Sequence, residues 1–598
     1  MSPTEKETGD SNGLGAGTQP TSSASISGQP KETMGAKTRS RSGSDSESGT
    51  SNEPQPHLHA KTFLAVFAVC CIYFVEIYNV VGAGAQTNTI ALTLNGSSKS
   101  VWLASPIAIL TAVLSPIVSQ AADYWGRKWF LVILTFIGAI GSIVIARATT
   151  MNMAIAGFSI TGIAYGVQPL LHAVSSEVLP RRYRAYGQAA NLIANGLGGI
   201  TALLVSGAFT RTSNAPSEGF RNYWYLATGL FILSSLLCAL VYQPLPTEKQ
   251  TSLTFTQKLK RLDWIGYLLF AAGIVLFCIG LSWSENPYPW SDAHTSATFA
   301  CGLFLVILFG LYETFAKKDG MFHHGLFRNR NFPVALFCIF CEGVAFFAAN
   351  NYFAFQVGVL YETDSLIVGV RFSIAMMVSI PAAIACGVYC SVTKKVRWVT
   401  VLSFIIFVAF FAALANTDAG SSREVWGLPV LMGLAIGLSL CVLITAAQLS
   451  TPPELVAITS GLLIGVRSLG GSVGLAIYNA LFNNAMNRLP DNVANAVLPL
   501  GLPQASLGPF IGALTTHNTA VLFTIPDVTP RIAGAGADAL LGTYSTGFNH
   551  VWIAASCFVA IATISACFLK ERTKEFNMHI DAPVEKEEDL YSLQDVRS

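Results

Sequence analysis

The chain has 598 residues, of which 52% are hydrophobic and only 12% are charged. A soluble domain usually carries about a quarter charged residues. The composition therefore excludes a disordered, collagenous or ordinary cytosolic protein and most enzyme classes, and it predicts a polytopic membrane protein. The net charge of +2 gives no reason to expect a nucleic-acid partner. All twelve cysteines lie inside apolar runs, where they are typical of small buried hydrophobes, so we predict no disulfide, metal site or cofactor.

The two ends of the chain differ from its middle. Residues 1–60 contain no Phe, Trp or Tyr and are rich in Ser, Thr, Gly, Glu and Lys. Such a segment cannot bury enough apolar surface to offset its chain entropy, which predicts a disordered tail. Residues 570–598 return to a polar and charged composition and are predicted to form a second tail.

Between these tails, fourteen apolar segments are long enough to cross a bilayer, which takes about 20 residues each. The first six, in a predicted bundle over residues 61–243, are residues 63–85, 101–121, 129–148, 154–174, 188–210 and 222–242. Two more, residues 264–283 and 296–315, lie in a predicted linker over residues 244–331. The last six, in a predicted bundle over residues 332–569, are residues 332–356, 365–390, 398–414, 426–447, 455–481 and 548–569. The link over about 483–547 is rich in Gly, Pro and Ala, and the sequence does not decide whether it forms an ordered lid.

The charge of the links supports this count. The links after spans two, four, six, eight and ten contain sixteen Lys and Arg residues, whereas the seven odd-numbered links contain seven. Because cytoplasmic links of membrane proteins are enriched in Lys and Arg, the even links and both chain ends are predicted to be cytoplasmic. A miscount of one span would have broken the alternation. On this topology the glycosylation sequon at Asn95 is external, although its short link places it close to the bilayer.

The link between the second and third spans reads Asp123-Tyr-Trp-Gly126-Arg127-Lys128. A short turn needs Gly, and the carboxylate and cations can cap helix ends and form ion pairs that hold one conformation. The segment resembles the signature between helices two and three of the major facilitator superfamily, except that Ser119 replaces the leading Gly. The alternative interpretation is ordinary positive-inside charge.

Further segments resemble a fungal, fourteen-span drug-efflux branch of that superfamily. They are residues 258–266, 286–290, 322–332 and 467–474. Within the branch, the chain is most similar to the trichothecene-efflux-pump type, a grouping that also takes in relatives of the fungal siderophore transporters. The resemblance implies an all-α fold of two six-helix bundles with two extra helices between them. It also implies secondary transport by rocking of the bundles around a mid-membrane cavity.

Two positions depart from the family pattern. Phe158 stands in span four where the superfamily normally has an Arg, which in relatives is linked to proton coupling. Span five has Asn195-Gly196-Leu197-Gly198-Gly199 where antiporters of the superfamily carry Gly-Pro. These departures weaken a direct transfer of the proton-antiport mechanism, although the glycines still permit a bend and close helix contact.

Two carboxylates, Glu76 and Glu342, lie near the centres of spans one and nine. A charged group there costs at least about 2.5–3.5 kcal/mol on insertion scales, so it usually faces the protein interior or a wet cavity. If the extra spans lie between the bundles, spans one and nine are equivalent, and both carboxylates face one cavity. We hypothesise that their titration couples proton movement to a change of state. The alternative is a structural Glu that is hydrogen-bonded to a neighbouring helix.

Other polar groups are weaker candidates for the same cavity. They are Asn79, Asn191, Asn195, Asn350, Asn351 and Arg467. Asn191 and Asn195 are four residues apart and share one helix face, which suits cavity lining and interhelical hydrogen bonding equally. For Arg467, snorkelling or capping of carbonyls is at least as consistent as binding of an anionic substrate. His172 and Glu177 suit a proton relay or, better, packing at the membrane interface.

The leading hypothesis is a secondary transporter that exports a hydrophobic small molecule, such as a toxin or xenobiotic, by proton antiport. Its partners are then the lipid bilayer, the small-molecule substrate and protons, with no obligatory protein partner, and the plasma membrane is favoured over the vacuole. The runner-up is uptake of a siderophore–iron chelate on the same scaffold. A third possibility is a non-transporting receptor with a signalling tail. No Walker sequence, catalytic triad or zinc-protease motif appears, which argues against an ATP-driven pump or a membrane enzyme.

Overall fold

The computed structural model describes residues 56–96, 99–212, 216–246, 248–283, 288–317, 320–515 and 519–584. All of these belong to one compact unit. Most of the predicted N-terminal tail and residues 585–598 of the C-terminal tail lie outside the described residues. The same holds for Ser97 of the sequon, whereas Asn95 is described and sits at the turn after the first span with a positive φ of 50°.

The described residues contain 14 helical segments that are long and apolar enough to cross a membrane, which confirms the predicted count. The first six are α1 (Ala60–Thr93), α2 (Val101–Trp125), α3 (Arg127–Ala146), α4 (Met151–Ala164) with its continuation η2 (Tyr165–Val167) and α5 (Gln168–Glu177), α6 (Arg184–Thr212) and α7 (Pro216–Val241). The two extra spans are α10 (Trp264–Trp283) and α11 (Ala293–Leu311). The last six are α13 (Asn331–Ala348) with η5 (Ala349–Phe353) and α14 (Ala354–Leu360), α15 (Ser365–Thr393), α16 (Arg397–Leu414), α17 (Leu428–Leu449), α18 (Val456–Met486) and α22 (Pro530–Ala566).

These segments are helical because a helix satisfies its backbone hydrogen bonds internally, which the hydrocarbon core of a bilayer requires. Several helix starts are capped by side chains, as the sequence allows. Thr150, Asp364 and Thr529 each accept a hydrogen bond from a backbone N–H in the first turn that follows. These polar residues therefore mark the positions at which the apolar helices begin.

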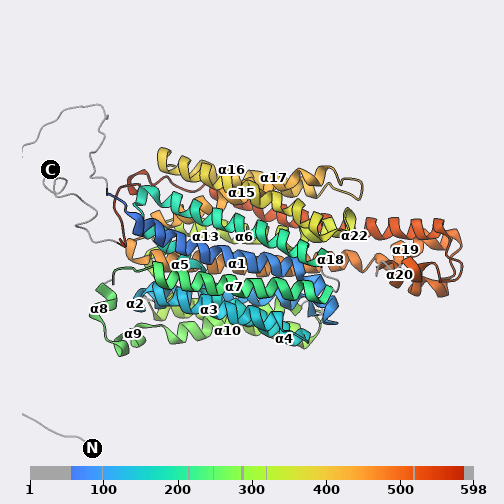
Figure 1. The fold of residues 1–598 in the computed structure, drawn as a ribbon, viewed down its shortest axis with the longest axis horizontal. Coiled ribbons are helices and arrows are strands. Elements are labelled where there is room, and N and C mark those ends of the chain that lie inside the picture. The colour runs from blue at the N-terminus through green and yellow to red at the C-terminus, as the bar shows by residue number, and fades with distance from the viewer. Residues whose placement is uncertain are drawn as a thin grey trace, which may run out of the picture. The chain divides into compact units, whose positions relative to one another are not determined.

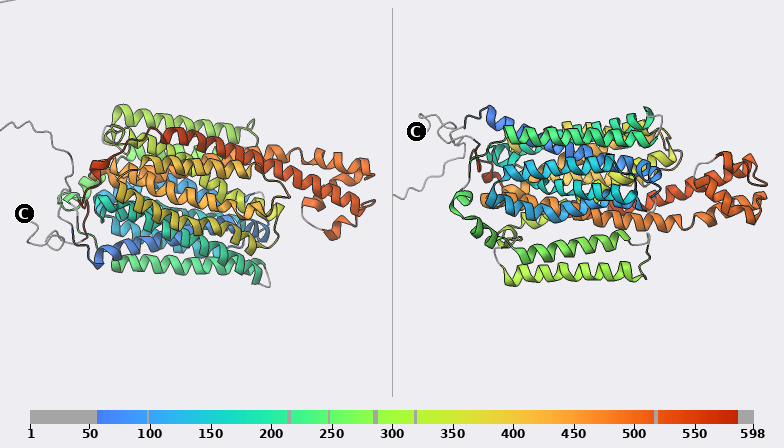
Figure 2. Two further views of the ribbon diagram at one scale, coloured as in Figure 1. Left: turned by 90° about the horizontal axis from the view of Figure 1, so that it is seen from above. Right: turned by 60° about the horizontal axis from the view of Figure 1, so that its bottom comes forward.

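The helices pack in two groups that meet mainly along two seams. In the first group α1 packs on α6 and α7, and α3 on α4 and α7. In the second group α13 packs on α18 and α22, and α15 and α16 on α17. The seams are α6 against α15 and α2 against α18, and the pair α10–α11 lies along the outside, with α10 against α2 and α18 (Figures 1 and 2).

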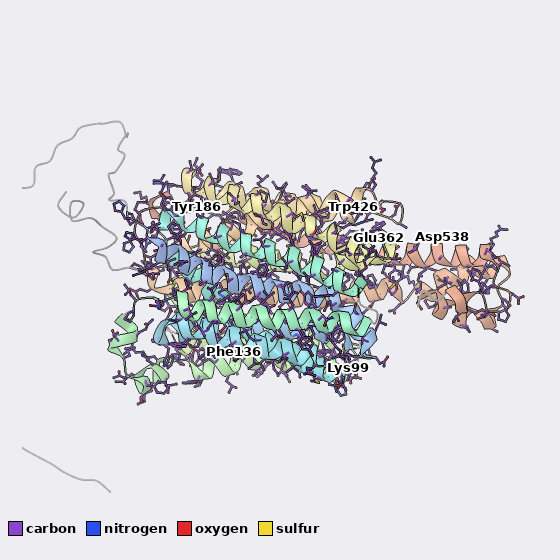
Figure 3. The ribbon with its side chains drawn as sticks, viewed as in Figure 1. Lys99, Phe136, Tyr186, Glu362, Trp426 and Asp538 are labelled. Atoms are coloured by element: carbon purple, nitrogen blue, oxygen red, sulfur yellow. The ribbon has the colours of Figure 1, made fainter. Side chains whose placement is uncertain are left out.

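One end of these helices carries the basic links. The turns from α2 to α3, from α5 to α6 and from α15 to α16 lie there, with Arg127, Arg182 and Lys394, and so do the short helices α8 (Glu248–Ser252) and α9 (Phe255–Arg261) (Figure 1, left). We call it the basic end. Figure 3 labels Tyr186 near this end, whereas Lys99, Glu362 and Trp426 lie near the opposite end.

In its described part, the link over residues 483–547 is largely helical, a point that the sequence did not decide. Helix α18 continues to Met486, and α22 begins at Pro530, well before the predicted start of the last span at residue 548. Between them lie α19 (Leu489–Val497), α20 (Leu507–Thr515) and α21 (Thr519–Leu522). These helices project beyond the spans, at the end opposite the basic end (Figure 1, right). They share a core of their own, which includes Val493, Val497, Phe510, Leu514 and Ile532.

Candidate functional site

The predicted pair of mid-span carboxylates is buried, but the two acids have different surroundings. Glu342 of α13 is fully buried and binds Arg467 of α18 through two contacts, Nε to Oε2 at 2.5 Å and Nη2 to Oε1 at 3.1 Å. The guanidinium also lies over the ring of Phe346, 4.5 Å from its centroid. Arg467 therefore does not snorkel. It neutralises Glu342 within the second group of helices.

Glu76 of α1 is also fully buried, yet neither of its carboxylate oxygens has a hydrogen-bond partner among the described residues. Its backbone carbonyl accepts a bond of 2.5 Å from the Tyr165 hydroxyl. Tyr73, one turn earlier on α1, meets the ring of His172 edge-to-face, with a centroid separation of 5.2 Å. Of the two predicted acids, Glu342 is thus paired, and Glu76 is unpaired among the described residues.

Asn79 is held by neighbouring helices instead of facing an open cavity. Its Oδ1 accepts a bond of 3.1 Å from Tyr165, and its Nδ2 donates to Ser142 of α3 at 3.5 Å. Asn79 is completely buried. The structure therefore favours interhelical hydrogen bonding for this candidate.

Asn191 and Asn195 form a polar stripe on α6 that faces α1 and α5. Asn191 accepts from Ser175 at 3.0 Å and from the Cys70 thiol at 3.7 Å. Asn195 donates to the Tyr73 hydroxyl at 3.3 Å. The stripe thereby touches Tyr73, which lies one turn before Glu76 on α1.

Gln188 extends this stripe toward the basic end and binds His172 of α5. Its Oε1 lies 2.7 Å from His172 Nδ1, and its Nε2 donates to Ser176 at 2.6 Å. The Nε2 atom of His172 is buried without a partner among the described residues. The proton relay considered above for His172 and Glu177 does not form, because the Glu177 carboxylate binds Arg127 instead.

The two candidates after Glu342 differ from each other. Asn350 lies against α1, since a Cβ built on Gly84 would be 3.2 Å from its Nδ2. Asn351 donates to the carbonyl of Phe347 on its own helix at 2.9 Å. The structure therefore brings Asn350 to the seam between α1 and η5, but it gives Asn351 a local role.

The predicted conformational motif is built around the turn from α2 to α3. Gly126 has a φ of +91°, a conformation that residues with a Cβ adopt only with strain. Arg127 lies 3.7 Å from Asp123 and donates to Glu177 of α5 at 2.8 Å. Lys128 forms no such bridge with the described residues and lies 5.9 Å from the ring centre of Trp129. The motif thus joins α2, α3 and α5 at the basic end.

At the position of the superfamily Arg in span four, Phe158 is fully buried in an aromatic contact. Its ring meets Trp224 of α7 edge-to-face, with a centroid separation of 5.0 Å. An apolar ring here packs α4 on α7 and cannot bind a proton.

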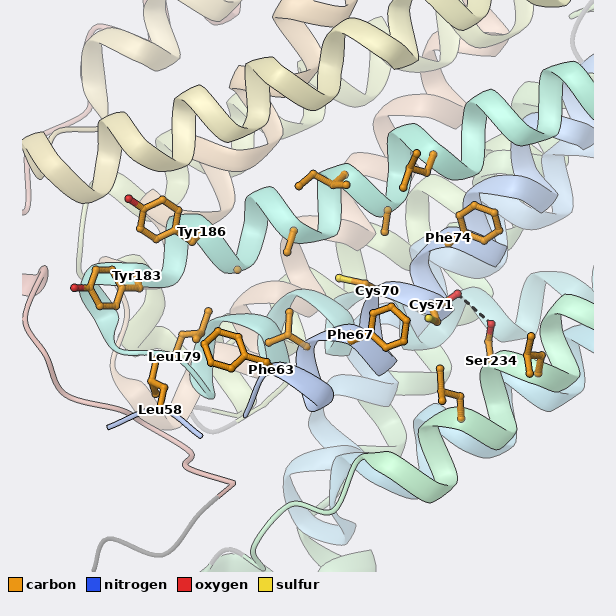
Figure 4. Close-up of a pocket in the computed structure, with 18 of the residues that line it drawn as sticks. Leu58, Phe63, Phe67, Cys70, Cys71, Phe74, Leu179, Tyr183, Tyr186 and Ser234 are labelled. Carbon is orange, nitrogen blue, oxygen red and sulfur yellow. Dashed lines mark hydrogen bonds between the residues drawn. The ribbon is translucent and has the colours of Figure 1, made fainter. Parts of the chain in front are cut away.

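A lateral groove of about 920 Å³ lies between α1, α6 and α7, near the basic end (Figure 4). Its walls are almost entirely apolar and include the exposed rings of Phe63 and Phe67 and the exposed side chain of Leu233. Cys70 lines the groove and also donates to Asn191. The groove therefore opens outward, while its floor adjoins the polar stripe of α6.

Sequence reasoning missed the groups that complete this site. The sequence did not predict Tyr73, Tyr165 or Gln448 of α17. Their partners, Asn195, Glu76 and Ser176, each lie far away along the chain. The only signal available was their polarity within apolar runs. Pairing of Glu342 with Arg467, 125 residues apart, has no local signal at all.

A model of the fungal trichothecene efflux pump (TRI12) family matches residues 18–588. The "MFS efflux transporter aclA" of Aspergillus oryzae is 25% identical over 507 residues, which are 83% of this chain and 87% of the relative. The "Trichothecene efflux pump TRI12" of Fusarium sporotrichioides is 21% identical over 538 residues, which are 87% and 88% of the two chains.

Solved structures with the same fold are major facilitator transporters. A bacterial homologue of the human lysosomal transporter Spinster, in an inward-facing and occupied conformation, superposes with a TM-score of 0.54 at 14% identity, covering 87% of this chain and 99% of its own. The proton:xylose symporter XylE superposes with a TM-score of 0.53 at 12% identity, covering 87% and 98%. These likenesses show the fold.

Proposed function

This chain belongs to the fungal trichothecene efflux pump family, whose members are multi-pass transporters and not enzymes, and from this membership we propose that it exports a hydrophobic small molecule by proton antiport. The relatives named above are described as efflux pumps, which supports export of a secondary metabolite, toxin or drug. Neither of them is described as a siderophore transporter. In this proposal the basic end faces the cytoplasm of the cell, in agreement with the positive-inside bias, and the protein resides in the plasma membrane.

The two helix groups are the moving parts of this proposal. Residues 61–243 and 332–569 rock against each other along the α6–α15 and α2–α18 seams, with the α10–α11 pair as a peripheral addition. In this proposal the candidate residues of both groups line one central site, to which α1 of the first group contributes Glu76 and α13 and α18 of the second contribute the Glu342–Arg467 pair. A substrate or proton bound there is exposed to one side of the membrane at a time.

The observation that carries proton coupling is the unpaired carboxyl of Glu76. An ionised carboxyl with no partner is costly in low-dielectric surroundings. Closing the site around Glu76 therefore favours the state in which the carboxyl carries a proton. In the antiport cycle, a proton taken up from outside neutralises Glu76, and its release to the cytoplasm accompanies the return of the empty site. Glu342 has a permanent counter-charge and is not needed as a carrier.

The test uses purified protein in vesicles with an imposed pH gradient and a panel of hydrophobic fluorescent solutes. Wild-type protein should move at least one solute against the flow of protons, and Glu76→Gln should abolish the dependence on the gradient. Glu313→Gln is the matched control, because Glu313 is also buried but its carboxylate accepts hydrogen bonds from the backbone N–H groups of Met321 and Phe322. Gradient-driven flux in Glu76→Gln equal to that of the control would refute this role, and siderophore-dependent rescue of iron-starved cells would refute export.

The lateral groove supports a hydrophobic substrate that arrives from the lipid. Its volume falls in the range of sites for small molecules, roughly 300–1,000 Å³. Ala190→Trp places a large ring inside the groove and should reduce efflux of solutes that partition into lipid, by about tenfold if most entry uses this route. Phe136→Trp, on the outer face of α3 (Figure 3), is the control and should have little effect. Equal efflux by both variants would exclude the groove as the entry route.

A further inference from the structure

The predicted polar tail after α22 is an ordered segment that crosses the basic end from the second helix group to the first. It starts firmly attached to the second group. The backbone N–H of Lys570 donates to Asn331 at 2.9 Å, and the Glu571 carboxylate accepts from the backbone N–H groups of Val396 at 2.8 Å and Arg397 at 3.1 Å. Glu571 thereby caps the start of α16. We call residues 571–584 the tail strap.

Beyond this attachment, the tail strap alternates in burial. Phe576, Met578 and Ile580 are each 9% exposed or less. Burial of every second residue is typical of an extended chain with one face on a core. Phe576 and Val584 belong to the same apolar core as the membrane spans. The alternation Phe-x-Met-x-Ile is present in the sequence, but the polar residues around it gave no reason to predict a buried segment.

The extended part of the strap is hydrogen-bonded to the link between α5 and α6 of the first group. The backbone N–H of Arg182 donates to the carbonyl of Asn577 at 2.8 Å, and that of Arg181 to the carbonyl of His579 at 3.0 Å. The backbone N–H of Ala582 donates to the carbonyl of Glu177 at 3.0 Å. A chain fixed to α16 at one end is therefore paired with the first group at the other.

Asp581 completes this connection with buried ion pairs. Its side chain is 3% exposed, accepts from Arg181 Nη2 at 2.8 Å and pairs with Arg184, whose side chain is 2% exposed. Arg184 also donates to the carbonyl of Gln448 on α17 at 3.2 Å. Asp581 of the tail thus neutralises Arg181 and Arg184 of the first group, and Arg184 also binds α17 of the second group.

The basic ends of the two groups could not separate with these bonds in place. The Gln448 side chain accepts from Ser176 of α5 at 2.6 Å, and the Cys441 thiol donates to the carbonyl of Ala185 at 3.5 Å. Both contacts join α17 to the first group, next to Arg184. Opening of the basic end would pull Arg184 from the Gln448 carbonyl or from Asp581, and loss of Asp581 would leave a buried charge without its partner, which is costly.

We propose that the tail strap is a latch of the transport cycle, in which Asp581 is the positioning residue that holds the basic ends of the two groups together and must leave Arg181 and Arg184 before this end opens. The inference rests on the alternating-access part of the proposed function. It needs neither a particular solute nor proton coupling.

The test measures opening directly through Cys441, which is fully buried where α17 meets α6 and should become reactive only when the basic end opens. The other eleven cysteines of the full-length chain are replaced, and the rate of Cys441 alkylation is followed in detergent and in vesicles. Asp581→Asn should raise this rate roughly tenfold or more, because loss of one partner of a buried ion pair exceeds the change that a tenfold shift requires. Asp581→Glu, which keeps the charge, should restore most of the slow rate.

Two further variants separate the latch from a loss of folding. Ala582→Pro removes the N–H that binds Glu177 without changing any charge, and it should also speed alkylation. Asp538→Asn removes an exposed carboxylate at the opposite end (Figure 3) and should leave the rate unchanged. Unchanged alkylation in both Asp581→Asn and Ala582→Pro would overturn the latch. Because alkylation is measured without any substrate, failure of the export proposal would not alter this outcome.

Discussion

Single residues in the centre of the protein differ mainly in whether their charge has a partner. Glu342 and Glu76 are equally buried, but only Glu342 is bound by an arginine. A buried ion pair is weak evidence for stability, whereas breaking one leaves an uncompensated charge. The pair with Arg467 therefore joins α13 to α18, and the unpaired Glu76 is the group to which the proposed function assigns the proton.

This difference gives a prediction for the ion pair. Glu342→Leu should destabilise the protein by about 3–5 kcal/mol, because it leaves Arg467 charged and buried. The double variant Glu342→Leu with Arg467→Met should recover most of the loss, since apolar groups of similar volume replace the pair. Thermal unfolding in detergent measures both. A double variant that is as unstable as the single one would show that the pair itself, and not the stranded charge, stabilises this contact.

At the residue scale, the sequence predicted which polar groups are buried but not which of them meet. Glu76, Asn191 and Asn195 stood out because their neighbours along the chain are apolar. Their partners come from other spans, and a single sequence carries no record of such contacts. Arg467 illustrates the limit. From its position in the sequence we expected it to snorkel to the membrane interface, cap backbone carbonyls or bind an anionic substrate, but its partner is Glu342, 125 residues away.

At the scale of helices, small residues decide how closely the spans approach. Gly196 of α6 faces α15, and a Cβ built there would lie 2.6 Å from the Ile380 side chain and 2.9 Å from the Met376 carbonyl. Gly229 of α7 has nothing within 4 Å of the corresponding position. The same residue type therefore has a packing role in one helix and none in the other.

We expect the two glycines to respond oppositely to alanine. Gly196→Ala should destabilise the protein by about 1–3 kcal/mol, because the added methyl group overpacks the α6–α15 seam. Gly229→Ala should stabilise it by about 0.8–1 kcal/mol, the difference in helix propensity. Thermal unfolding in the same detergent compares them. The prediction fails if Gly196→Ala is at least as stable as the unaltered chain.

The spans themselves were predictable because length and apolarity are enough to identify a membrane helix. Extended segments and partly polar helix turns could not be predicted in this way. The start of α22 at Pro530 was missed because its first turns are too polar for a span, and they pack on the projecting helices instead. The tail strap was missed because three buried apolar residues stand among charged ones.

At the scale of the whole molecule, stability is expected to be divided between separate cores. Most of the spans share one large apolar core, whereas the helices over residues 489–540 pack around a second one. Phe510 is completely buried in this second core, and its ring lies against Gly536. A part with its own core can open without the rest, and the cost of opening is then set locally.

Phe510→Ala tests this division. Loss of a buried Phe typically costs about 3–5 kcal/mol, so amide hydrogens over residues 489–540 should exchange much faster in the variant, while those of α13 and α18 keep their protection. Hydrogen exchange followed by mass spectrometry resolves the two regions. Phe523→Ala is the control, because that ring is 56% exposed and its removal should change little. If exchange in α13 and α18 accelerates together with that of the projecting helices, the two cores unfold as one unit and the projecting helices are part of the transport domain.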